Sequence, residues 1–551
     1  MDGSLAVLPN DGLARAPADR LHPMTPRSPW PELLALGAVA LVMRIGASLL
    51  VADPAYLDPA YYELVARHLA TGAGFSIPVI WSFLDVGGVL PADPQLPIEA
   101  NRHWMPMTAI VSAGSMALFG STRLAAELPH AILGAALVPL TGWIGWSLWR
   151  SRMVAVIAGI LALFAGPMLV YVPMVDSFAL FGAFGSIAIL AAIRAIRPGG
   201  GGWWLVLAGV AAALATLTRI DGALLGLAPA SAWLARRGIG PWRVGGPPIS
   251  AWWAVIGVLA GLAVLAPWLA RQLSEFGSIL PSAGGRLVWI TSYNEQFSIT
   301  GNPSLGTYLD EGVGAILASK AGTLGLLIGR TAVLLGGALV LPFFFGLWRE
   351  RGRPELAPFL IYWVALFAVM VLLFTVHAPF GAYYHSAWAW LPFALPLAAA
   401  NGGPMLEAVG SRLPMLRRPR NMRFLAIAAL VGGVLLSVVG SAALVSQWRR
   451  DSATLASAAA WLRANASRND VVMYVDPPSL NLMTGNPVVA PPFDPPGVIG
   501  EVAHAYDVEW VVVERAAGSE TDALGLWDGA PWLADGPSFD EGNVRIFLAG
   551  G

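Results

Sequence analysis

Long apolar runs separated by short polar turns occupy most of the chain. A membrane-spanning helix needs about 20 predominantly apolar residues. The runs that meet or approach this length are 33–51, 129–149, 153–172, 177–195, 203–218, 222–235, 250–270, 323–347, 357–376, 383–400 and 424–446. The pattern therefore predicts a mainly α-helical, polytopic membrane protein with about 11 transmembrane helices.

Short apolar segments decide how the chain alternates across the membrane. Segment 106–120 is below spanning length, so we expect it to lie in the outer interface without crossing. Segments 203–218 and 222–235 are also short and meet at Arg219–Asp221. If neither of these two segments crosses the membrane, two crossings are removed together, so the predicted orientation of every later loop is unchanged.

Arginine clusters predict the orientation, because cytoplasmic loops of membrane proteins carry an excess of Lys and Arg. A cytoplasmic N-terminus followed by regular alternation places every strong cluster inside. These are Arg15, Arg20 and Arg27 in the tail, then Arg150/Arg152, Arg194/Arg197, Arg236/Arg237/Arg243, Arg349/Arg351/Arg353 and the 412–423 cluster. We expect residues 1–30 to form a cytoplasmic tail before a retained anchor in the cytoplasmic (inner) membrane. Regions 52–128, 271–322 and the chain after about 447 then face outward.

The last part of the chain, 447–551, has the pattern of a small soluble domain that follows the membrane domain at 31–446. Segments 452–466 and 497–507 are predicted helices. Predicted strands occupy 470–475, 509–514 and 543–549. Because strands alternate with helices, we expect an extracytoplasmic α/β layer.

Composition agrees with a membrane protein and excludes several function classes. Mean hydropathy is +0.64, with 56% hydrophobic and 12% charged residues. Lys+Arg 33 against Asp+Glu 34 gives no global charge that would indicate a nucleic-acid partner. Cys is 0, which excludes a disulfide framework, a thiolate nucleophile and a cysteine zinc site. There is no phosphate-binding Gly-Lys loop, no GxSxG elbow and no HExxH helix.

Two acids lie where the chain is predicted to leave the membrane on its outer side. Asp58 follows the first span and precedes Tyr61 and Tyr62, and Asp176 lies at the next outer turn. Asp at the start of a helix is a common cap, and Pro59 fits the first turn, so capping and catalysis are both open for Asp58. Two carboxylates at one membrane depth favour function, because ionisable groups near the bilayer are costly. A cap could still account for Asp176 alone.

A metal site is a further hypothesis for this outer surface. Asp58, His103 and Asp176 together could hold a divalent cation, although their spacing is not a metal signature. The alternative for His103 is a packed or hydrogen-bonded histidine beside Trp104. No other cofactor is indicated.

Basic residues near the same surface are candidate ligands for a lipid phosphate. Guanidinium groups suit bidentate phosphate contacts, although arginine near the headgroup plane commonly snorkels to lipid. Arg219 has the alternative of a structural ion pair with Asp221. The candidates are Arg219, Arg271, Arg286 and the single lysine, Lys320. His377 and His385 flank another outer turn, where we expect a structural or acceptor-lining role.

Several sequence blocks occur in an order that resembles a known family. These are DPAYYELVARHLATGAGF at 58–75, LTRIDG at 217–222, PWLARQLSEFGSILPS at 267–282 and YNEQF at 293–297. The order is similar to that of polytopic glycosyltransferases of the GT-C class, in the group of ArnT, protein mannosyltransferases and Rgt-like enzymes. The resemblance covers roughly residues 30 to 400 and predicts a GT-C-like fold.

The resemblance implies a sugar donor linked to polyprenyl phosphate, with transfer on the outer face and inversion at the anomeric carbon. It implies a general-base role for Asp58, a second acidic position at Asp176, and a donor-phosphate role for Arg271. Pro59 stands where several relatives have a second acid, and Pro106 stands alone where relatives have a proline pair. Candidate substrate contacts are Tyr61, Tyr62, His103, Tyr293, Glu295, His377 and His385.

The acceptor could be a saccharide, a lipid or a protein, and nothing in the sequence selects a sugar. A transporter or flippase of a lipid-linked saccharide is the main alternative, and a noncatalytic scaffold that displays its C-terminal domain is another. A transporter is expected to show internal pseudo-symmetry and ionisable groups near the midplane. The acids cluster instead at one predicted surface, which favours glycosyl transfer.

Overall fold

The computed structural model describes residues 28–51, 55–164, 169–279, 284–410, 418–514, 530–534, 536–541 and 543–550. The predicted cytoplasmic tail up to residue 27, with Arg15, Arg20 and Arg27, lies outside the described residues. So do residues 412–417 of the last arginine cluster.

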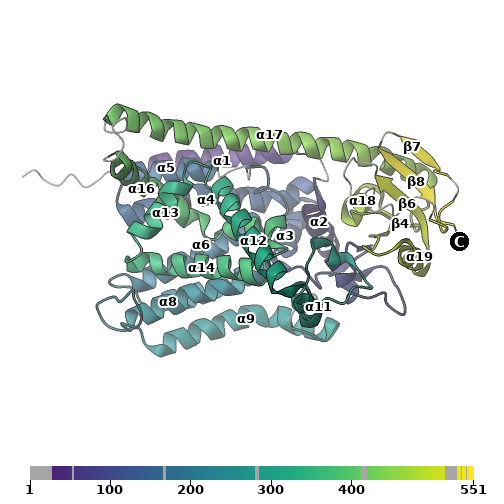
Figure 1. The fold of residues 1–551 in the computed structure, drawn as a ribbon, viewed down its shortest axis with the longest axis horizontal. Helices are drawn as coiled ribbons and strands as arrows, with labels where there is room; N and C mark the ends of the chain where they lie inside the picture. Colours follow the sequence, from purple (N-terminus) through teal and green to yellow (C-terminus); the bar gives the residue numbers. More distant parts are fainter. Residues whose placement is uncertain are drawn as a thin grey trace, which may run out of the picture.

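Most helices of the molecule run side by side along its long axis, and the strands of the C-terminal region gather at one end (Figure 1). Seven described helices are long and apolar enough to cross a membrane. They are α1 (Trp30–Leu50), α4 (Arg123–Trp149), α6 (Ser177–Ile196), α9 (Ala251–Phe276), α12 (Gly312–Leu334), α14 (Ala357–Leu372) with its preceding turn η5 (Pro354–Leu356), and α17 (Pro419–Asn465). The mainly α-helical, multi-pass architecture predicted from the sequence is confirmed.

Further helices complete the bundle. They are α5 (Arg152–Leu163), α7 (Trp203–Thr218), η3 (Ile220–Gly226), α8 (Leu227–Arg236), α13 (Val340–Arg349), η6 (Ala378–Phe380), α15 (Ala382–Ala387) and α16 (Leu391–Gly410). Large side chains such as Phe181, Phe343 and Trp390 are fully buried in the core between these helices. Helix length alone supports seven spans and does not establish the predicted number.

Several helix boundaries follow local chemistry that hydropathy does not report. Thr122, Ser151 and Ser250 accept backbone N–H groups and begin α4, α5 and α9. The predicted span 323–347 is wrong as one helix, because Gly336 and Gly337 adopt φ of 66° and 76° and separate α12 from α13.

Two further predicted helices also have different limits. The predicted helix 153–172 ends at Leu163, with Phe164 in a non-helical conformation. The predicted helix 383–400 is instead the short helix α15 followed by α16, which begins at Leu391.

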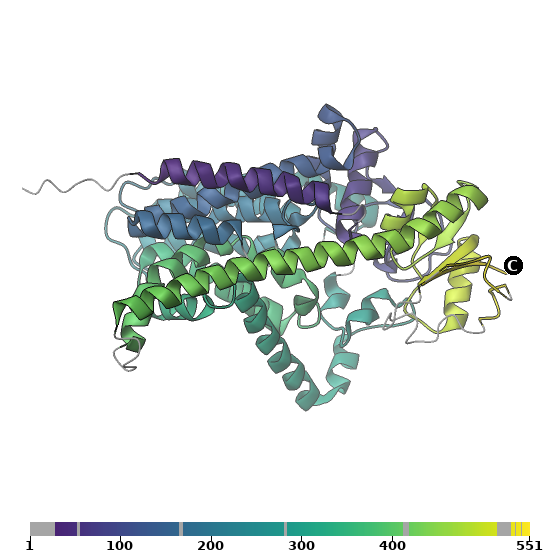
Figure 2. The same cartoon turned by 90° about the horizontal axis from the view of Figure 1, so that it is seen from above.

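Helix α17 is continuous over 47 residues. The sequence pattern predicts two helices here, at 424–446 and 452–466, with a domain boundary near 447. The stretch that joins them contains no Gly or Pro, so nothing ends the helix when the polar residues begin. One continuous helix therefore runs from the membrane bundle into the C-terminal region (Figures 1 and 2).

The C-terminal region contains a six-stranded sheet with the order β2-β5-β4-β6-β8-β7. Strands β4 (Val471–Met473), β6 (Val508–Glu514) and β8 (Val544–Leu548) and helix α19 (Pro496–Ala505) confirm the predicted elements. Strands β5 (Val488–Val489) and β7 (Phe539–Glu541) and helix α18 (Pro477–Thr484) are additional. Strand β2 (Val79–Ile80) pairs in parallel with β5, so region 52–128, the predicted first outer loop, contributes the edge strand of this sheet.

The first outer loop packs into one layer with the C-terminal region. Its helices α2 (Leu57–Ala70) and α3 (Met107–Phe119) lie together, and α18 packs on α2. Segment 106–120, predicted to lie in the outer interface without crossing, forms helix α3, and its interfacial position stays a prediction. The remaining elements are β1 (Ser76–Ile77), η1 (Phe83–Val86), β3 (Ile98–Glu99), α10 (Gly284–Leu287), η4 (Tyr293–Phe297) and α11 (Leu305–Asp310).

Asp494 holds region 271–322, the predicted second outer loop, against this layer. It is 7% exposed and accepts hydrogen bonds from Ser298 Oγ and Ile299 N, both at 2.7 Å. Thr300 donates to the same carboxylate through its N and Oγ1 atoms. A single buried acid therefore satisfies several donors of the loop.

Candidate active site

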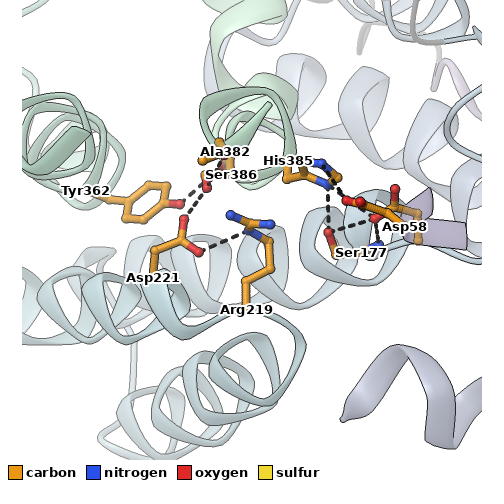
Figure 3. A network of polar contacts seen from close by, with 9 residues as sticks. Asp58, Ser177, Arg219, Asp221, Tyr362, Ala382, His385 and Ser386 are labelled. Atoms are coloured by element: carbon orange, nitrogen blue, oxygen red, sulfur yellow. Dashed lines mark hydrogen bonds and ion pairs between the residues drawn. The ribbon is translucent and has the colours of Figure 1, made fainter. Parts of the chain in front are cut away.

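Three titratable residues from distant parts of the chain meet where α2, α6 and α15 come together (Figure 3). They are Asp58, Asp176 and His385, and their ligand atoms lie within 4.8 Å of one another. Two carboxylates and one imidazole form a donor set that suits a divalent cation. The residues therefore fit a metal ion as well as acid–base chemistry.

Asp176 is fixed by its own helix. It is the N-cap of α6, where its carboxylate accepts the Ser177 N–H, and it accepts the Ser177 hydroxyl at 3.2 Å. Its other oxygen accepts the Tyr56 hydroxyl at 2.6 Å. The residue is 1% exposed. The capping interpretation of Asp176 is confirmed, and the carboxylate is held in one orientation by three donors.

Asp58 is not a cap. Tyr56 is the N-cap of α2 and makes no side-chain cap bond, whereas Asp58 is the second helical residue. Its side chain is 37% exposed. Burial of the group among the helices and then the nearby charge of Asp176 raise the pKa of Asp58 to about 7, with His385 and Arg219 acting in the opposite sense. Asp58 is thus able to take up and release a proton near neutral pH.

His385 lies between the two acids. Its Nδ1 atom is 2.9 Å from Ser177 Oγ and 3.3 Å from Asp176 Oδ1. Its Nε2 atom is 3.9 Å from Asp58 Oδ2. The ring stacks on Phe178 with the centroids 4.0 Å apart and the planes at 12°. Stacking and the Nδ1 contacts set the ring so that Nε2 faces Asp58.

A second polar network adjoins the first through helix α15. Ser386, the neighbour of His385, donates its hydroxyl to Asp221, and Asp221 accepts Arg219 Nε at 3.1 Å. Tyr362 donates to the Ser386 carbonyl at 3.3 Å. In Figure 3 the Arg219 guanidinium lies between Asp221 and Ser177, and it interacts electrostatically with both acids of the first network.

Arg271 is not brought to these carboxylates. Its Nη2 atom donates to Glu99 Oε2 at 2.7 Å and to the Ala100 carbonyl at 3.2 Å. The guanidinium also lies 4.7 Å from the ring centroid of Phe75. The arginine therefore binds the first outer loop to the end of α9.

The other two basic candidates also contact backbone away from this site. Arg286 Nη1 donates to the Gly88 carbonyl at 3.1 Å. Lys320 donates to the Leu372 carbonyl at 2.8 Å and to the Thr375 hydroxyl. None of these contacts involves Asp58, Asp176 or His385.

Tyr61 and Tyr62, which follow Asp58 in α2, pack against the segment that contains His103 and Trp104. The Tyr61 hydroxyl accepts Asn101 N at 2.9 Å, and its ring lies 4.3 Å from Trp104. Tyr62 packs its ring 5.0 Å from the same tryptophan. Burial lowers the pKa of His103 to about 4, so this residue is neutral at pH 7. In the described structure His385 occupies the place beside the acids that the metal hypothesis gave to His103.

Three further candidate substrate contacts, Tyr293, Glu295 and His377, form a separate group. Tyr293 stacks on Phe380 at 4.3 Å, and His377 Nε2 is 3.3 Å from Gln296 Oε1. Glu295 completes a capping box with Ser292 at the start of η4. Its carboxylate is therefore engaged locally.

Sequence reasoning did not find four members of the two networks. Tyr56 and Ser177 are chain neighbours of the predicted acids, and that proximity was the available signal. Ser386 and Tyr362 carried none, because their partners are distant in sequence and only the fold brings them together.

Comparison with known proteins bears on the fold. No family model and no curated protein sequence matches the chain. ArnT from Cupriavidus metallidurans bound to undecaprenyl phosphate is similar in structure, with a TM-score of 0.57 and 15% identity over 94% of this chain and 97% of that chain. Its apo state gives a TM-score of 0.56. The Archaeoglobus fulgidus oligosaccharyltransferase in its apo form gives 0.50, with 12% identity over 90% of this chain and 71% of that chain. The chain therefore has the GT-C-like fold that its sequence predicts.

Proposed function

We propose that the chain is an inverting glycosyltransferase. It moves a sugar from a polyprenyl-phosphate-linked donor to a hydroxyl acceptor at the outer face of the cytoplasmic membrane. The observation that carries the proposal is the pairing of a partly exposed Asp58 with a fixed, buried Asp176 through His385. The fold shared with an enzyme bound to undecaprenyl phosphate supports the class of donor.

The reaction needs one base at the acceptor. Asp58 takes the proton of the acceptor hydroxyl while the acceptor oxygen forms a bond to the anomeric carbon. The bond between that carbon and the phosphate oxygen breaks, and its electron pair leaves with the lipid phosphate. Attack from the face opposite the leaving group inverts the anomeric centre. A base so placed contributes about 10²–10⁴-fold.

Asp176 and His385 support the base without replacing it. Asp176 is too buried to meet an acceptor, and its oxygens are engaged by Tyr56 and Ser177. Its negative charge helps to hold the pKa of Asp58 near the working pH, after burial as the larger cause. His385 faces Asp58 through Nε2 and fixes the distance between the two acids.

Arg219 is the basic group placed to balance the charge of the leaving phosphate. Its side chain is 21% exposed, and Asp221 orients it through Nε. Fixed cations that face a developing phosphate charge act as preorganised electrostatic stabilisers. The donor-phosphate roles of Arg271, Arg286 and Lys320 stay predictions, since their described contacts are elsewhere.

Asp58, Asp176 and His385 are also able to hold a divalent cation. When bound, such an ion neutralises phosphate charge and orients the leaving group. The roles of the base and of Arg219 do not depend on it.

The test is a donor panel with the purified protein in lipid nanodiscs. Polyprenyl phosphates that carry different hexoses or pentoses are offered with saccharide, lipid and peptide acceptors. We expect release of polyprenyl phosphate, seen by mass spectrometry, together with a glycosylated acceptor whose anomeric configuration is inverted by NMR. Movement of intact lipid-linked saccharide across proteoliposomes without donor consumption would replace the proposal with a flippase.

A further inference from the structure

An apolar groove lies between α1 and α17. Its volume is about 780 Å³. Met43, Gly46 and Leu50 line it from α1, and Val438, Ala442 and Val445 line it from α17. The two helices run along the same side of the bundle (Figures 1 and 2). In a membrane this space must be filled by something apolar, because an empty groove of this size is unfavourable.

The groove has an apolar part and a basic end. Its lining on α17 extends from Val438 to Ala453, which is about 22 Å at the rise of an α-helix. The first residues along this length are apolar except for Ser441, whereas Arg449 and Arg450 lie at the other end. The shape and polarity therefore fit a hydrocarbon chain that ends in an anionic headgroup.

Arg449 and Arg450 are each held by a hydrogen bond and retain further N–H donors. Arg449 donates through Nε to the Leu50 carbonyl at 2.9 Å, which ties α17 to the end of α1. Arg450 donates through Nη1 to Ser446 Oγ at 2.8 Å. A guanidinium has five N–H donors, so each arginine retains the fork that binds phosphate oxygens.

An aromatic stack connects this end of the groove to the carboxylates. Trp448 stacks on Tyr56 with the centroids 5.5 Å apart, and it meets Tyr171 edge-on at 5.0 Å. Tyr56 in turn donates to Asp176 at 2.6 Å. Trp448, next to Arg449 in α17, and Tyr56 therefore link this helix to Asp176.

We propose that this groove binds an anionic phospholipid of the bilayer, with one chain along α1 and α17 and the phosphate on Arg449 and Arg450. Bilayer phospholipid surrounds a membrane-facing groove at far higher concentration than any minor lipid. The paired positive charges select those with net negative charge over zwitterionic ones. This site is independent of the proposed glycosyl transfer.

The test is native mass spectrometry of the detergent-purified full chain during titration with phosphatidylglycerol or phosphatidylcholine. We expect phosphatidylglycerol to be retained selectively and to raise the thermal unfolding temperature. Arg450→Gln should weaken its binding about tenfold, the loss typical of a charge-assisted phosphate contact. Arg423→Gln, an exposed arginine of the same helix outside the groove, should bind as the parent does.

A second variant tests the apolar part of the groove separately from the two arginines. A Cβ atom added at Gly46 meets no atom within 4 Å, and Gly46 lines the groove, so Gly46→Leu should fold while occupying lipid volume. Gly432→Leu on α17 is the matched control, since a Cβ atom there also meets no atom within 4 Å and Gly432 does not line the groove. We expect loss of phosphatidylglycerol for Gly46→Leu only.

Three outcomes would overturn the proposal. One is equal binding of phosphatidylglycerol and phosphatidylcholine. Another is unchanged phosphatidylglycerol binding in both the arginine and the glycine variants. The third is displacement of phosphatidylglycerol by equimolar undecaprenyl phosphate, which would assign the groove to a polyprenyl lipid.

Discussion

The Nε2 atom of His385 lies 3.9 Å from Oδ2 of Asp58, although the first residue is in α15 and the second in α2. The same ring contacts Asp176 through its other nitrogen. One acid is buried and fixed by hydrogen bonds, and the other remains 37% exposed. The two carboxylates therefore stand in different environments, which is the basis for proposing Asp176 as the supporting and Asp58 as the reacting group.

The rate of transfer should depend on pH through Asp58. A base acts only when it is deprotonated, and the pKa of Asp58 is raised to about 7 by burial and by Asp176. Activity should therefore rise as pH increases through about 7 and level off above it. Asp176→Asn removes the second cause, so the midpoint should move to lower pH. A pH profile of initial rates decides this, and a midpoint unchanged in the variant contradicts the proposed coupling.

A divalent cation should move the same midpoint. An ion held by Asp58, Asp176 and His385 favours the ionised carboxylate, so Mn²⁺ or Mg²⁺ should lower the pH midpoint relative to protein treated with EDTA. His385→Ala should abolish the shift. Identical profiles with and without metal would exclude the triad as a metal site.

Ser386 should affect the rate of glycosyl transfer by positioning other residues of the site. Its hydroxyl donates to Asp221, which orients Arg219, and it neighbours His385 on α15. Loss of one such hydrogen bond costs about 1 kcal/mol, or roughly a fivefold lower rate. Ser386→Thr should restore most of the activity that Ser386→Ala loses. Ser231→Ala, which removes a buried hydroxyl bond within α8, is the control and should transfer normally.

Asp494 should matter for stability more than for chemistry. Asp494→Ala leaves the donors of Ser298, Ile299 and Thr300 without their acceptor, at a cost of about 1–3 kcal/mol. Thermal unfolding should show the loss. Asp540→Ala removes an acid that is 44% exposed and pairs with Arg545, so it should cost less than about 1 kcal/mol. Equal effects of the two variants would contradict the anchoring role of Asp494.

The sequence was sufficient to locate the acids but not their partners. Asp58 and Asp176 stand out because each follows or precedes an apolar run, a local signal. The pairing of His385 with both depends on where α15 packs, which no periodicity encodes. The same limit applies to Arg271, whose motif was recognised but whose partner Glu99 was not.

The fold shows the same division between local and distant information. The approximate positions of the helices could be predicted because hydropathy is a property of one continuous segment. The predicted helix boundaries were wrong where Gly336 and Gly337 interrupt an apolar run. They were also wrong in α17, which continues because its polar stretch contains no helix breaker. The pairing of β2 with β5 joins two-residue strands from opposite ends of the chain, too short to give a pattern.

The measurement that tests the central claim most directly compares Asp58→Asn with Asp93→Asn, an exposed acid of the same outer loop. Both proteins are purified in nanodiscs, checked for thermal stability, and assayed for release of polyprenyl phosphate from a donor that the parent uses. We predict that Asp58→Asn lowers transfer by about 10²–10⁴-fold with folding intact, whereas Asp93→Asn transfers normally. Transfer by Asp58→Asn at the rate of Asp93→Asn would contradict the assignment of Asp58 as the base.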